Sequence, residues 1–247
     1  SEMCIRDSHK AVDKVNLHIK KGAIYGFIGR NGAGKTTCLK MISGLARPTA
    51  GEIEMFGCKG KELERIRSRV GCLIEAPGLY GNMNAYTNLK IKCELFGIRK
   101  KGYIEDILET VGLEGVGKKK TKHFSLGMKQ RLGIGLALVG EPDLLVLDEP
   151  INGLDPQGIA EVRDTIQRLR DERNMTILIS SHILEELSKI ATDYGIIHNG
   201  SLLQELTSEE LMKRCSERIE IELIHPEQAV PILDRICLLY TSDAADE

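Results

Sequence analysis

The sequence contains no tryptophan, and aromatic residues make up only 4% of its 247 residues. Proteins that bind single-stranded nucleic acid stack bases on aromatic side chains, so this scarcity argues against such a platform. An excess of one charge is also absent, since 34 Lys and Arg stand against 36 Asp and Glu. This near-neutral balance gives no electrostatic footprint for nucleic acid. No apolar run approaches the roughly 18 residues of a membrane-spanning helix.

Cysteines are present but form no recognisable pairing pattern. The seven cysteines include no C-x-x-C spacing, and no signal peptide precedes them, so we expect reduced cytosolic thiols. Hydrophobic residues at 42% and charged residues at 28% are typical of a globular protein. A chain of 247 residues fits one domain of ordinary depth, or one large α/β domain with an appendage.

The two ends of the chain do not resemble the sequence between them. One codon choice for residues 237–242 is TGT CTC TTA TAC ACA TCT, and its reverse complement, in a shifted frame, encodes residues 3–7. A single DNA tag read in both directions explains this match better than chance, even though each residue can be encoded by several codons. We therefore expect tags over residues 1–8 and 237–247, a single domain over residues 9–215, and the start of a truncated extension over residues 216–236.

Hydropathy alternates between strand and helix periods along most of the chain. Strands are predicted over residues 15–20, 23–28, 52–56, 70–74, 144–147, 176–179, 194–197 and 219–223. Helices are predicted over residues 35–43, 159–172 and 184–191, with a helical insert over about 84–140. Asn199-Gly200 predicts a hairpin turn. Buried strands with intervening helices indicate an α/β fold with a parallel-sheet core.

The strongest motif is the run Gly-Arg-Asn-Gly-Ala-Gly-Lys-Thr at residues 29–36, which matches G-x-x-x-x-G-K-[ST]. It follows a predicted strand and opens a predicted helix, where glycines let backbone N–H groups turn toward phosphate oxygens. Lys35 would reach the β- and γ-phosphates, and the Thr36 hydroxyl would bind Mg²⁺. A glycine-rich turn without a ligand is the weaker interpretation. We predict a nucleoside triphosphate site formed by Gly29, Asn31, Gly32, Ala33, Gly34, Lys35, Thr36 and Thr37.

A second motif, at residues 144–150, places two acids directly after four apolar residues. Ligands of open α/β sheets bind at the carboxyl ends of strands, so these acids should lie beside the phosphate loop. Asp148 is predicted to hold Mg²⁺ through water, and Glu149, on the other side, to polarise an attacking water. Alone, the pattern also fits a strand that simply ends in acids. The phosphate loop favours the functional interpretation.

The run Phe-Ser-Leu-Gly-Met-Lys-Gln-Arg at residues 124–131, taken with these motifs, makes residues 9–205 resemble the ATP-binding cassette family. The family signature is L-S-G-G-Q before a helix. Ser125 and Gly127 are kept, whereas its first glycine and its glutamine are Leu and Met here. The resemblance implies a P-loop NTPase fold with a parallel-sheet core, an N-terminal antiparallel β portion and a helical insert. It also implies that Ser125 and Gly127 clamp the ATP of a partner cassette in a head-to-tail dimer.

Two further motifs extend the resemblance. The run Asn-Gly-Leu-Asp that ends at Asp155 is similar to the family's D-loop, although Ile151 replaces its usual small hydroxyl residue. His182 follows a predicted strand and matches the histidine that hydrogen-bonds the γ-phosphate. The resemblance thus implies catalytic roles for Lys35, Glu149 and His182, and a nucleotide-binding role for Asp155.

One position departs from the general family pattern. After the strand predicted over residues 70–74 the family carries a glutamine that contacts Mg²⁺, and here Glu75 takes its place. This feature and the signature run are similar to the bacitracin and lantibiotic exporter subgroup. Glu75 is therefore expected near Mg²⁺, or else is a polar replacement without mechanistic effect. The family's adenine-stacking aromatic residue would fall near Arg6, inside the expected tag.

The resemblance implies an ATPase subunit of an exporter for peptide antibiotics, with ATP and Mg²⁺ as cofactors. The expected partners are a second cassette and an integral-membrane permease, at the cytoplasmic face of a bacterial plasma membrane, with no nucleic acid. A soluble cassette ATPase not coupled to transport is the alternative. A nucleotide-binding regulator without turnover is disfavoured because Lys35, Asp148, Glu149 and His182 are all present. The lysine-rich run at residues 118–122 is interpreted as a solvated loop.

Overall fold

The computed structural model describes residues 10–216 of the chain. The expected tags, residues 217–236 of the expected extension and the strand predicted over residues 219–223 lie outside the described residues. By its contacts the chain forms two units, Ser1–Glu210 and Leu211–Glu247. In the second unit only the end of helix α8 (Ser208–Ser216) is described.

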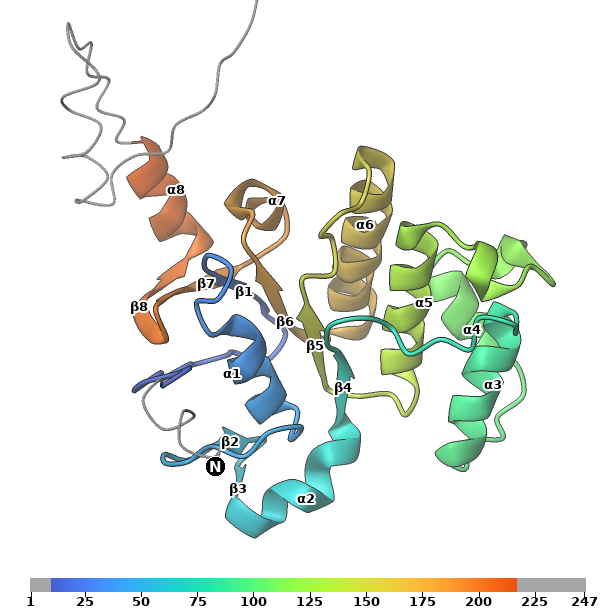
Figure 1. Ribbon diagram of the computed structural model, residues 1–247, viewed down its shortest axis with the longest axis horizontal. Helices are drawn as coiled ribbons and strands as arrows, with labels where there is room; N and C mark the ends of the chain where they lie inside the picture. The colour runs from blue at the N-terminus through green and yellow to red at the C-terminus, as the bar shows by residue number, and fades with distance from the viewer. Residues whose placement is uncertain (1–9, 217–247) are drawn as a thin grey trace, which may run out of the picture. The chain divides into compact units, whose positions relative to one another are not determined.

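The centre of the first unit is a six-stranded sheet with the strand order β4-β5-β6-β1-β7-β8 (Figure 1). All neighbouring strands are parallel except β7 and β8, which are antiparallel. Asn199 and Gly200, between β7 and β8, have φ of 46° and 79°, as a tight hairpin turn requires, so the predicted hairpin is confirmed. The strands are β1 (Ile24–Ile28), β4 (Val70–Leu73), β5 (Leu144–Asp148), β6 (Thr176–Ser181), β7 (Asp193–His198) and β8 (Ser201–Thr207).

Helices cover both faces of this sheet. Helix α1 (Lys35–Ile42) lies on one face, and α5 (Leu126–Leu138) and α6 (Pro156–Arg173) lie on the other (Figure 1). The short helix α7 (Leu184–Ser188) follows β6. Every residue of β5 and β6 is buried, as expected for central parallel strands that are covered on both sides.

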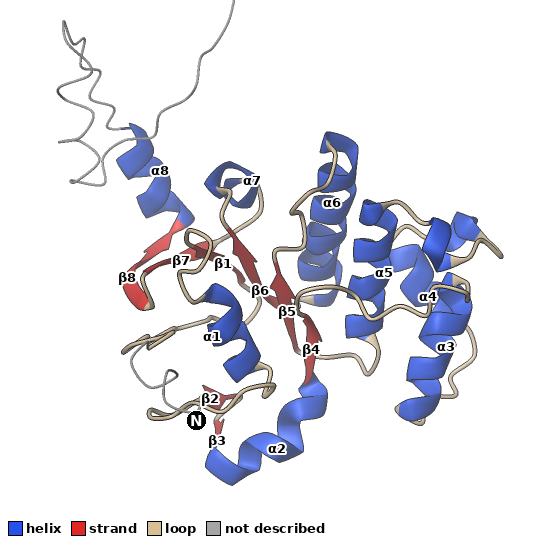
Figure 2. Ribbon diagram, in the orientation of Figure 1, coloured by secondary structure: helices blue, strands red, loops and turns tan. Residues whose placement is uncertain are grey.

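Three helices follow one another in the region where the helical insert was predicted. They are α3 (Ala85–Leu95), α4 (Tyr103–Thr110) and α5, and they pack against one another (Figure 2). The Asn84 side chain begins α3 by accepting the Thr87 backbone N–H at 2.8 Å. Because α5 also contacts β4 and α6, it connects these helices to the sheet.

The antiparallel β portion near the N-terminus is small. Strand β2 (Glu54–Met55) pairs with β3 (Cys58–Lys59), and helix α2 (Leu63–Ile66) follows. The strand predicted over residues 52–56 is therefore shorter than expected, and β3 and α2 were not predicted. Two-residue strands carry too short an alternation for hydropathy to reveal.

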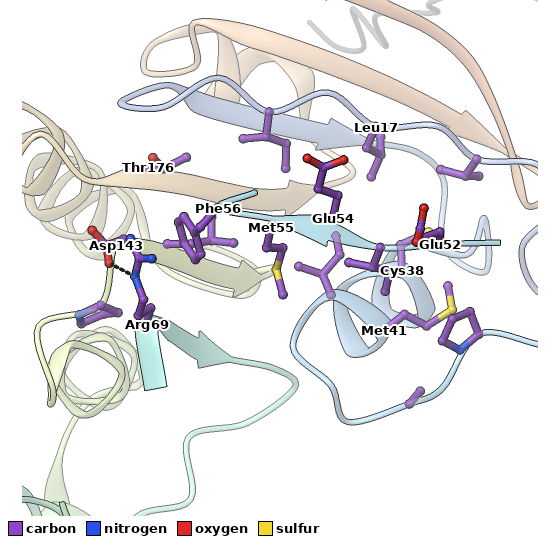
Figure 3. A pocket seen from close by; sticks show the side chains of 18 of the residues that line it. Leu17, Cys38, Met41, Glu52, Glu54, Met55, Phe56, Arg69, Asp143 and Thr176 are labelled. Atoms are coloured by element: carbon purple, nitrogen blue, oxygen red, sulfur yellow. Dashed lines mark hydrogen bonds and ion pairs between the residues drawn. The ribbon is translucent and has the colours of Figure 1, made fainter. Parts of the chain in front are cut away.

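The strand predicted over residues 15–20 does not form, so this prediction is wrong. Exposure still alternates along the N-terminal segment (residues 10–20), where Leu17 is half-buried and His18 is exposed. Strand β1 is already flanked by β6 and β7, and the segment pairs with neither edge strand of the described sheet, β4 or β8. The His18 backbone N–H instead donates to the Glu205 carboxylate at 2.9 Å. A hollow of about 1780 Å³ lies beside the segment (Figure 3) and is lined partly by Leu17, Met41, Met55 and Phe56.

Candidate active site

The loop between β1 and α1 has glycines at positions where a side chain would be strained or would clash. Gly32 and Gly34 adopt φ of 81° and 103°, and a Cβ at Gly34 would lie 2.6 Å from the Ala11 carbonyl oxygen. A Cβ at Gly29 would lie 2.5 Å from the Ile197 carbonyl oxygen. No side chain caps the first turn of α1. Its backbone N–H groups are therefore available to an anion.

Lys35 opens α1 and is only 5% exposed. Its Nζ donates to the carbonyl oxygens of Gly29 (2.5 Å) and Arg30 (3.2 Å) and forms an ion pair with Glu149 Oε1 at 3.1 Å. A buried ammonium requires partners of this kind. Phosphate oxygens entering the loop could replace them. In the same helix, burial raises the pKa of the Cys38 thiol to about 11, which keeps this side chain neutral.

Asp148 and Thr36 place two oxygen donors side by side. At the end of β5, Asp148 Oδ2 accepts a hydrogen bond from Thr36 Oγ1 at 2.8 Å, and Asp148 Oδ1 accepts one from Ser180 Oγ at 2.6 Å. Among the described residues, no group of three or more His, Cys, Asp and Glu could hold a metal by itself. Mg²⁺ is usually bound by one or two carboxylates together with substrate phosphates and waters. One carboxylate and one hydroxyl beside a phosphate loop fit that requirement.

Glu149 directly follows β5 with a left-handed backbone, at a φ of 47°. Its Oε2 lies 2.8 Å from His182 Nδ1, and its Oε1 forms the ion pair with Lys35. Its backbone N–H donates to Ser180 Oγ at 2.9 Å. A partly exposed carboxylate with a fixed orientation is suited to accept a proton from a water molecule.

These side chains meet because three parallel strands end at one edge of the sheet. The register pairs Ile28 of β1 with Ser181 of β6, and Asp148 of β5 with Ser180 of β6. The motifs assigned no role to Ser180, although hydroxyl residues that follow three apolar residues at the end of a buried strand are a usable signal. Hydrogen bonds and ion pairs, with Ser180 as the link between Asp148 and Glu149, join five predicted site residues: Lys35, Thr36, Asp148, Glu149 and His182.

The signature residue Ser125 and the D-loop residue Asp155 lie at the starts of two neighbouring helices. Ser125 caps α5 by accepting the Met128 N–H at 3.2 Å, and Asp155 caps α6 by accepting the Gly158 N–H at 3.2 Å. The two helix starts lie close together, since a Cβ on Gly127 would be in van der Waals contact with the Gly158 Cα at 3.4 Å. The hydrogen bonds of Ser125 and Asp155 are thus local, and neither joins the cluster around Asp148.

Glu75 follows β4 with a φ of 64° and is 65% exposed at its side chain. Its Oε1 forms an ion pair with Lys40 Nζ of α1 at 2.5 Å. The structure thus pairs Glu75 with a lysine, and its predicted contact with Mg²⁺ stays a prediction. Lys40 was not singled out by the motifs, because this contact depends on the position of α1 over the sheet.

Comparison with known proteins decides the family. A sequence profile of the ABC transporter family matches residues 12–152. The chain belongs to the ABC transporter family. This ABC chain is 49% identical to the bacitracin transport ATP-binding protein BcrA of Bacillus licheniformis over 229 residues, 92% of this chain and 75% of that protein. It is 46% identical to the lantibiotic transport ATP-binding protein SrtF of Streptococcus pyogenes over 195 residues, 78% of this chain and 83% of that protein.

Solved ABC cassettes have the same fold as this ABC chain. An ATP-binding subunit of an ABC transporter aligns with a TM-score of 0.73 and 27% identity, covering 92% of this chain and 95% of that one. The dimeric cassette MJ0796 bound to ADP and phosphate aligns with a TM-score of 0.71 and 24% identity, covering 80% and 90%. The predicted cassette fold and the predicted ATPase of a transporter are confirmed. Within residues 10–216, no helix has the length and apolar character to cross a membrane.

The hollow in Figure 3 is distinct from the acidic cluster of this ABC chain. Thr37 and Cys38 of α1 contribute to its lining, together with the ion pair between Arg69 and Asp143 (Nε–Oδ2, 2.7 Å). Neither Asp148 nor the catalytic candidates reach it. Thr37, a predicted phosphate-loop residue, thus lines the hollow, whereas the acidic cluster lies outside it.

Proposed function

We propose that this chain is the ATP-hydrolysing subunit of an exporter for peptide antibiotics. Two cassettes would pair head to tail beneath an integral-membrane permease, at the cytoplasmic face of a bacterial plasma membrane. The observation that carries the proposal is the Glu149 carboxylate, held between Lys35 and His182 beside the Asp148–Thr36 pair. Identities of 49% and 46% to bacitracin and lantibiotic transport proteins support the substrate class.

Nucleotide binding would begin at the phosphate loop. The N–H groups at the start of α1 would donate hydrogen bonds to the phosphate oxygens. Lys35 would leave its present partners, the Gly29 carbonyl oxygen and Glu149, and bind the β- and γ-phosphates. Thr36 and Asp148 are the residues that would hold Mg²⁺, which neutralises phosphate charge when bound. Thr36 would then turn its hydroxyl from Asp148 toward the ion.

Hydrolysis would depend on Glu149 once Lys35 has turned to the phosphates. The carboxylate accepts the proton of an attacking water, while His182 fixes its orientation through the contact at Oε2. Before nucleotide binds, the same carboxylate is neutralised by Lys35. This exchange of partners links phosphate binding to activation of the base.

A second cassette would complete the site. Ser125 caps α5 and Gly127 lies in its first turn, where N–H groups favour an anion. The hydrogen bond of Ser125 is a local cap within its own helix. These residues are therefore free of the acidic cluster of their own chain and suited to the γ-phosphate bound by a partner, with Asp155 beside them at the start of α6.

An apolar hollow provides a surface for the permease. Leu95 is 81% exposed and Leu45 is 64% exposed, and exposed apolar side chains that gather at one place mark partner sites. Ile74 lines this hollow and Glu75 directly follows it, so a carboxylate lies next to the apolar surface and could pair with a basic group of the permease. The hollow has a volume of about 370 Å³ and is lined by residues that include Leu45, Ile74, Tyr80, Leu95 and Phe96.

The test is co-expression with a candidate integral-membrane permease, in a bacterium sensitive to bacitracin and to a lantibiotic. We expect resistance only when both proteins are present, and an ATPase rate in membranes that rises when the permease is included. The Glu149→Gln variant serves as the inactive control. A cassette that hydrolyses ATP at the same rate with and without the permease, and confers no resistance, would support the soluble alternative.

A further inference from the structure

The hydroxyl of Ser180 lies between the two acids of the proposed ATPase site. Ser180 is the fifth residue of β6 and is 0% exposed. Its strand is otherwise built mainly from apolar residues, and a buried hydroxyl is costly unless it forms hydrogen bonds. The sheet register places it opposite Asp148 of the neighbouring strand. Its position is therefore determined by the sheet and not by a mobile loop.

Both hydrogen-bonding functions of this hydroxyl are used on the acids. Ser180 Oγ donates to Asp148 Oδ1 at 2.6 Å and accepts the backbone N–H of Glu149 at 2.9 Å. A hydroxyl has one proton to donate and can accept at the same time, so one atom serves both contacts. The bond to Asp148 is short, as expected when the acceptor is a carboxylate.

The contact to Glu149 restrains an unfavourable backbone. A φ of 47° is uncommon for a residue with a side chain, and such conformations persist only when surrounding contacts hold them. Ser180 binds the N–H of Glu149, and the carbonyl oxygen of Glu149 accepts the Asn152 N–H at 3.1 Å. The peptide groups on both sides of the Glu149 Cα are thereby fixed, and the side chain is directed to Lys35 and His182.

We propose that Ser180 is a positioning residue of the ATPase site, which orients the Asp148 carboxylate and holds the turn that directs Glu149. Thr36 can leave Asp148 Oδ2 when an ion is bound. Ser180 stays in place, because its second bond is to the backbone of the same turn. In this role it acts through Asp148 and Glu149. This inference rests on the proposed ATPase function.

The test compares Ser180→Ala with Ser180→Thr in the full chain assembled with its permease. Ser180→Ala removes both contacts, so we expect kcat to fall about tenfold or more while KM for ATP changes by less than about threefold. Ser180→Thr keeps the hydroxyl and should recover most of the lost rate. Thr176→Val is the matched control, because Thr176 is also a buried hydroxyl residue of β6. Its Oγ1 accepts the Gly22 N–H at 3.0 Å and makes no hydrogen bond to Asp148 or Glu149.

A second readout does not depend on turnover. The affinity of ADP, measured by fluorescence titration in EDTA, should be the same for Ser180→Ala and the unaltered chain, because the phosphate loop and Lys35 are intact. With Mg²⁺ present, Ser180→Ala should bind ADP more weakly than the unaltered chain by about threefold or more, because Asp148 has lost its orientation. Thr176→Val should show no such difference between the two conditions.

Two results would overturn the positioning role. One is a Ser180→Ala variant with kcat within twofold of the unaltered chain. The other is a loss of rate and of ADP affinity in both conditions that Thr176→Val reproduces, which would make Ser180 a structural residue only. If the unaltered chain itself shows no ATPase activity, the proposed function fails first, so the two failures are distinguishable.

Discussion

The carboxyl edge of the sheet and the N-terminal segment both carry clear apolar patterns, but only the first forms regular structure. Strands β5 and β6 each have two parallel neighbours and are buried at every residue. The N-terminal segment packs Val15, Leu17 and Ile19 against the core and faces a hollow beside it. Apolar alternation decides which side chains turn inward, whereas a strand also needs a neighbouring backbone to bond.

Side chains, and not a ladder, hold the middle of the N-terminal segment. Glu205 of β8 accepts the His18 backbone N–H and the Tyr25 hydroxyl at 2.9 and 2.6 Å, and its Oε2 lies 2.8 Å from His18 Nδ1. Burial alone would raise the pKa of Glu205, but the hydrogen bonds from Tyr25 and His18 outweigh it and lower this pKa. The Glu205 carboxylate thus attaches the segment to the sheet at His18, whereas the strands are attached by repeated backbone hydrogen bonds.

The largest effect is expected from removing the acid at the carboxyl edge. Glu149→Gln keeps the shape of the side chain but cannot accept a proton, so ATP hydrolysis should fall about 10²–10⁴-fold. ATP binding should persist, and paired cassettes should accumulate in size-exclusion chromatography with saturating ATP and Mg²⁺. Glu172→Gln, at an exposed position near the end of α6, is the control and should change neither quantity. A Glu149→Gln variant that stays monomeric would contradict the base assignment.

Core truncation should separate the two regions in stability. Leu145 in the middle of β5 is fully buried, so Leu145→Ala should lower the free energy of unfolding by about 2–5 kcal/mol. Leu17→Ala, at a half-buried position beside the hollow, should lower it by about 1 kcal/mol or less. Urea unfolding followed by circular dichroism gives both values. Equal losses would show that the N-terminal segment is packed as tightly as the sheet.

The hydrogen bonds of Glu205 should make part of the free energy of unfolding depend on pH. Tyr25→Phe removes a hydrogen bond to a carboxylate and should cost about 1–2 kcal/mol at neutral pH. The folded pKa of Glu205 lies below its ordinary value of 4.5, so this stabilisation is present above that value and is lost as the pH falls through the folded pKa.

Unfolding measured at several pH values checks this expectation. The difference between Tyr25→Phe and the unaltered chain should shrink as the pH is lowered below 4.5. Tyr103→Phe is the comparison, because the Tyr103 hydroxyl accepts the Gly140 N–H at 3.0 Å, a neutral partner. A pH-independent loss for Tyr25→Phe would argue against a charged Glu205 as the acceptor.

The smallest effect on hydrolysis is expected at Glu75. Glu75→Gln removes the charge that pairs with Lys40, and this exposed pair is separate from the contacts of Glu149 with Lys35 and His182. ATPase activity should stay within about tenfold, or ~1.4 kcal/mol in barrier, while antibiotic resistance in the assembled transporter weakens. A rate as low as that of Glu149→Gln would make Glu75 itself catalytic.

Local sequence determined the parts of the site that adjacent residues build. The run at residues 29–36 joins a strand to a helix, and its glycines are required by positive φ and close carbonyl contacts at those same positions. Asp148 ends a strand that begins with four apolar residues, Glu149 follows it directly, and Asn199-Gly200 forms a turn by its own conformational preferences. In each case the physical cause lies within a few residues of the pattern that reveals it.

Tertiary structure alone decided which of these pieces touch. Ser180 reaches Asp148 because β5 and β6 are neighbours in a particular register, and Glu75 meets Lys40 because α1 covers the sheet. The N-terminal segment likewise forms no strand although its apolar pattern alternates: β1 already has both neighbours, and the segment pairs with neither edge strand. Hydropathy and backbone preference act between adjacent residues, whereas strand order and hydrogen-bond partners follow from the packing of the entire sheet.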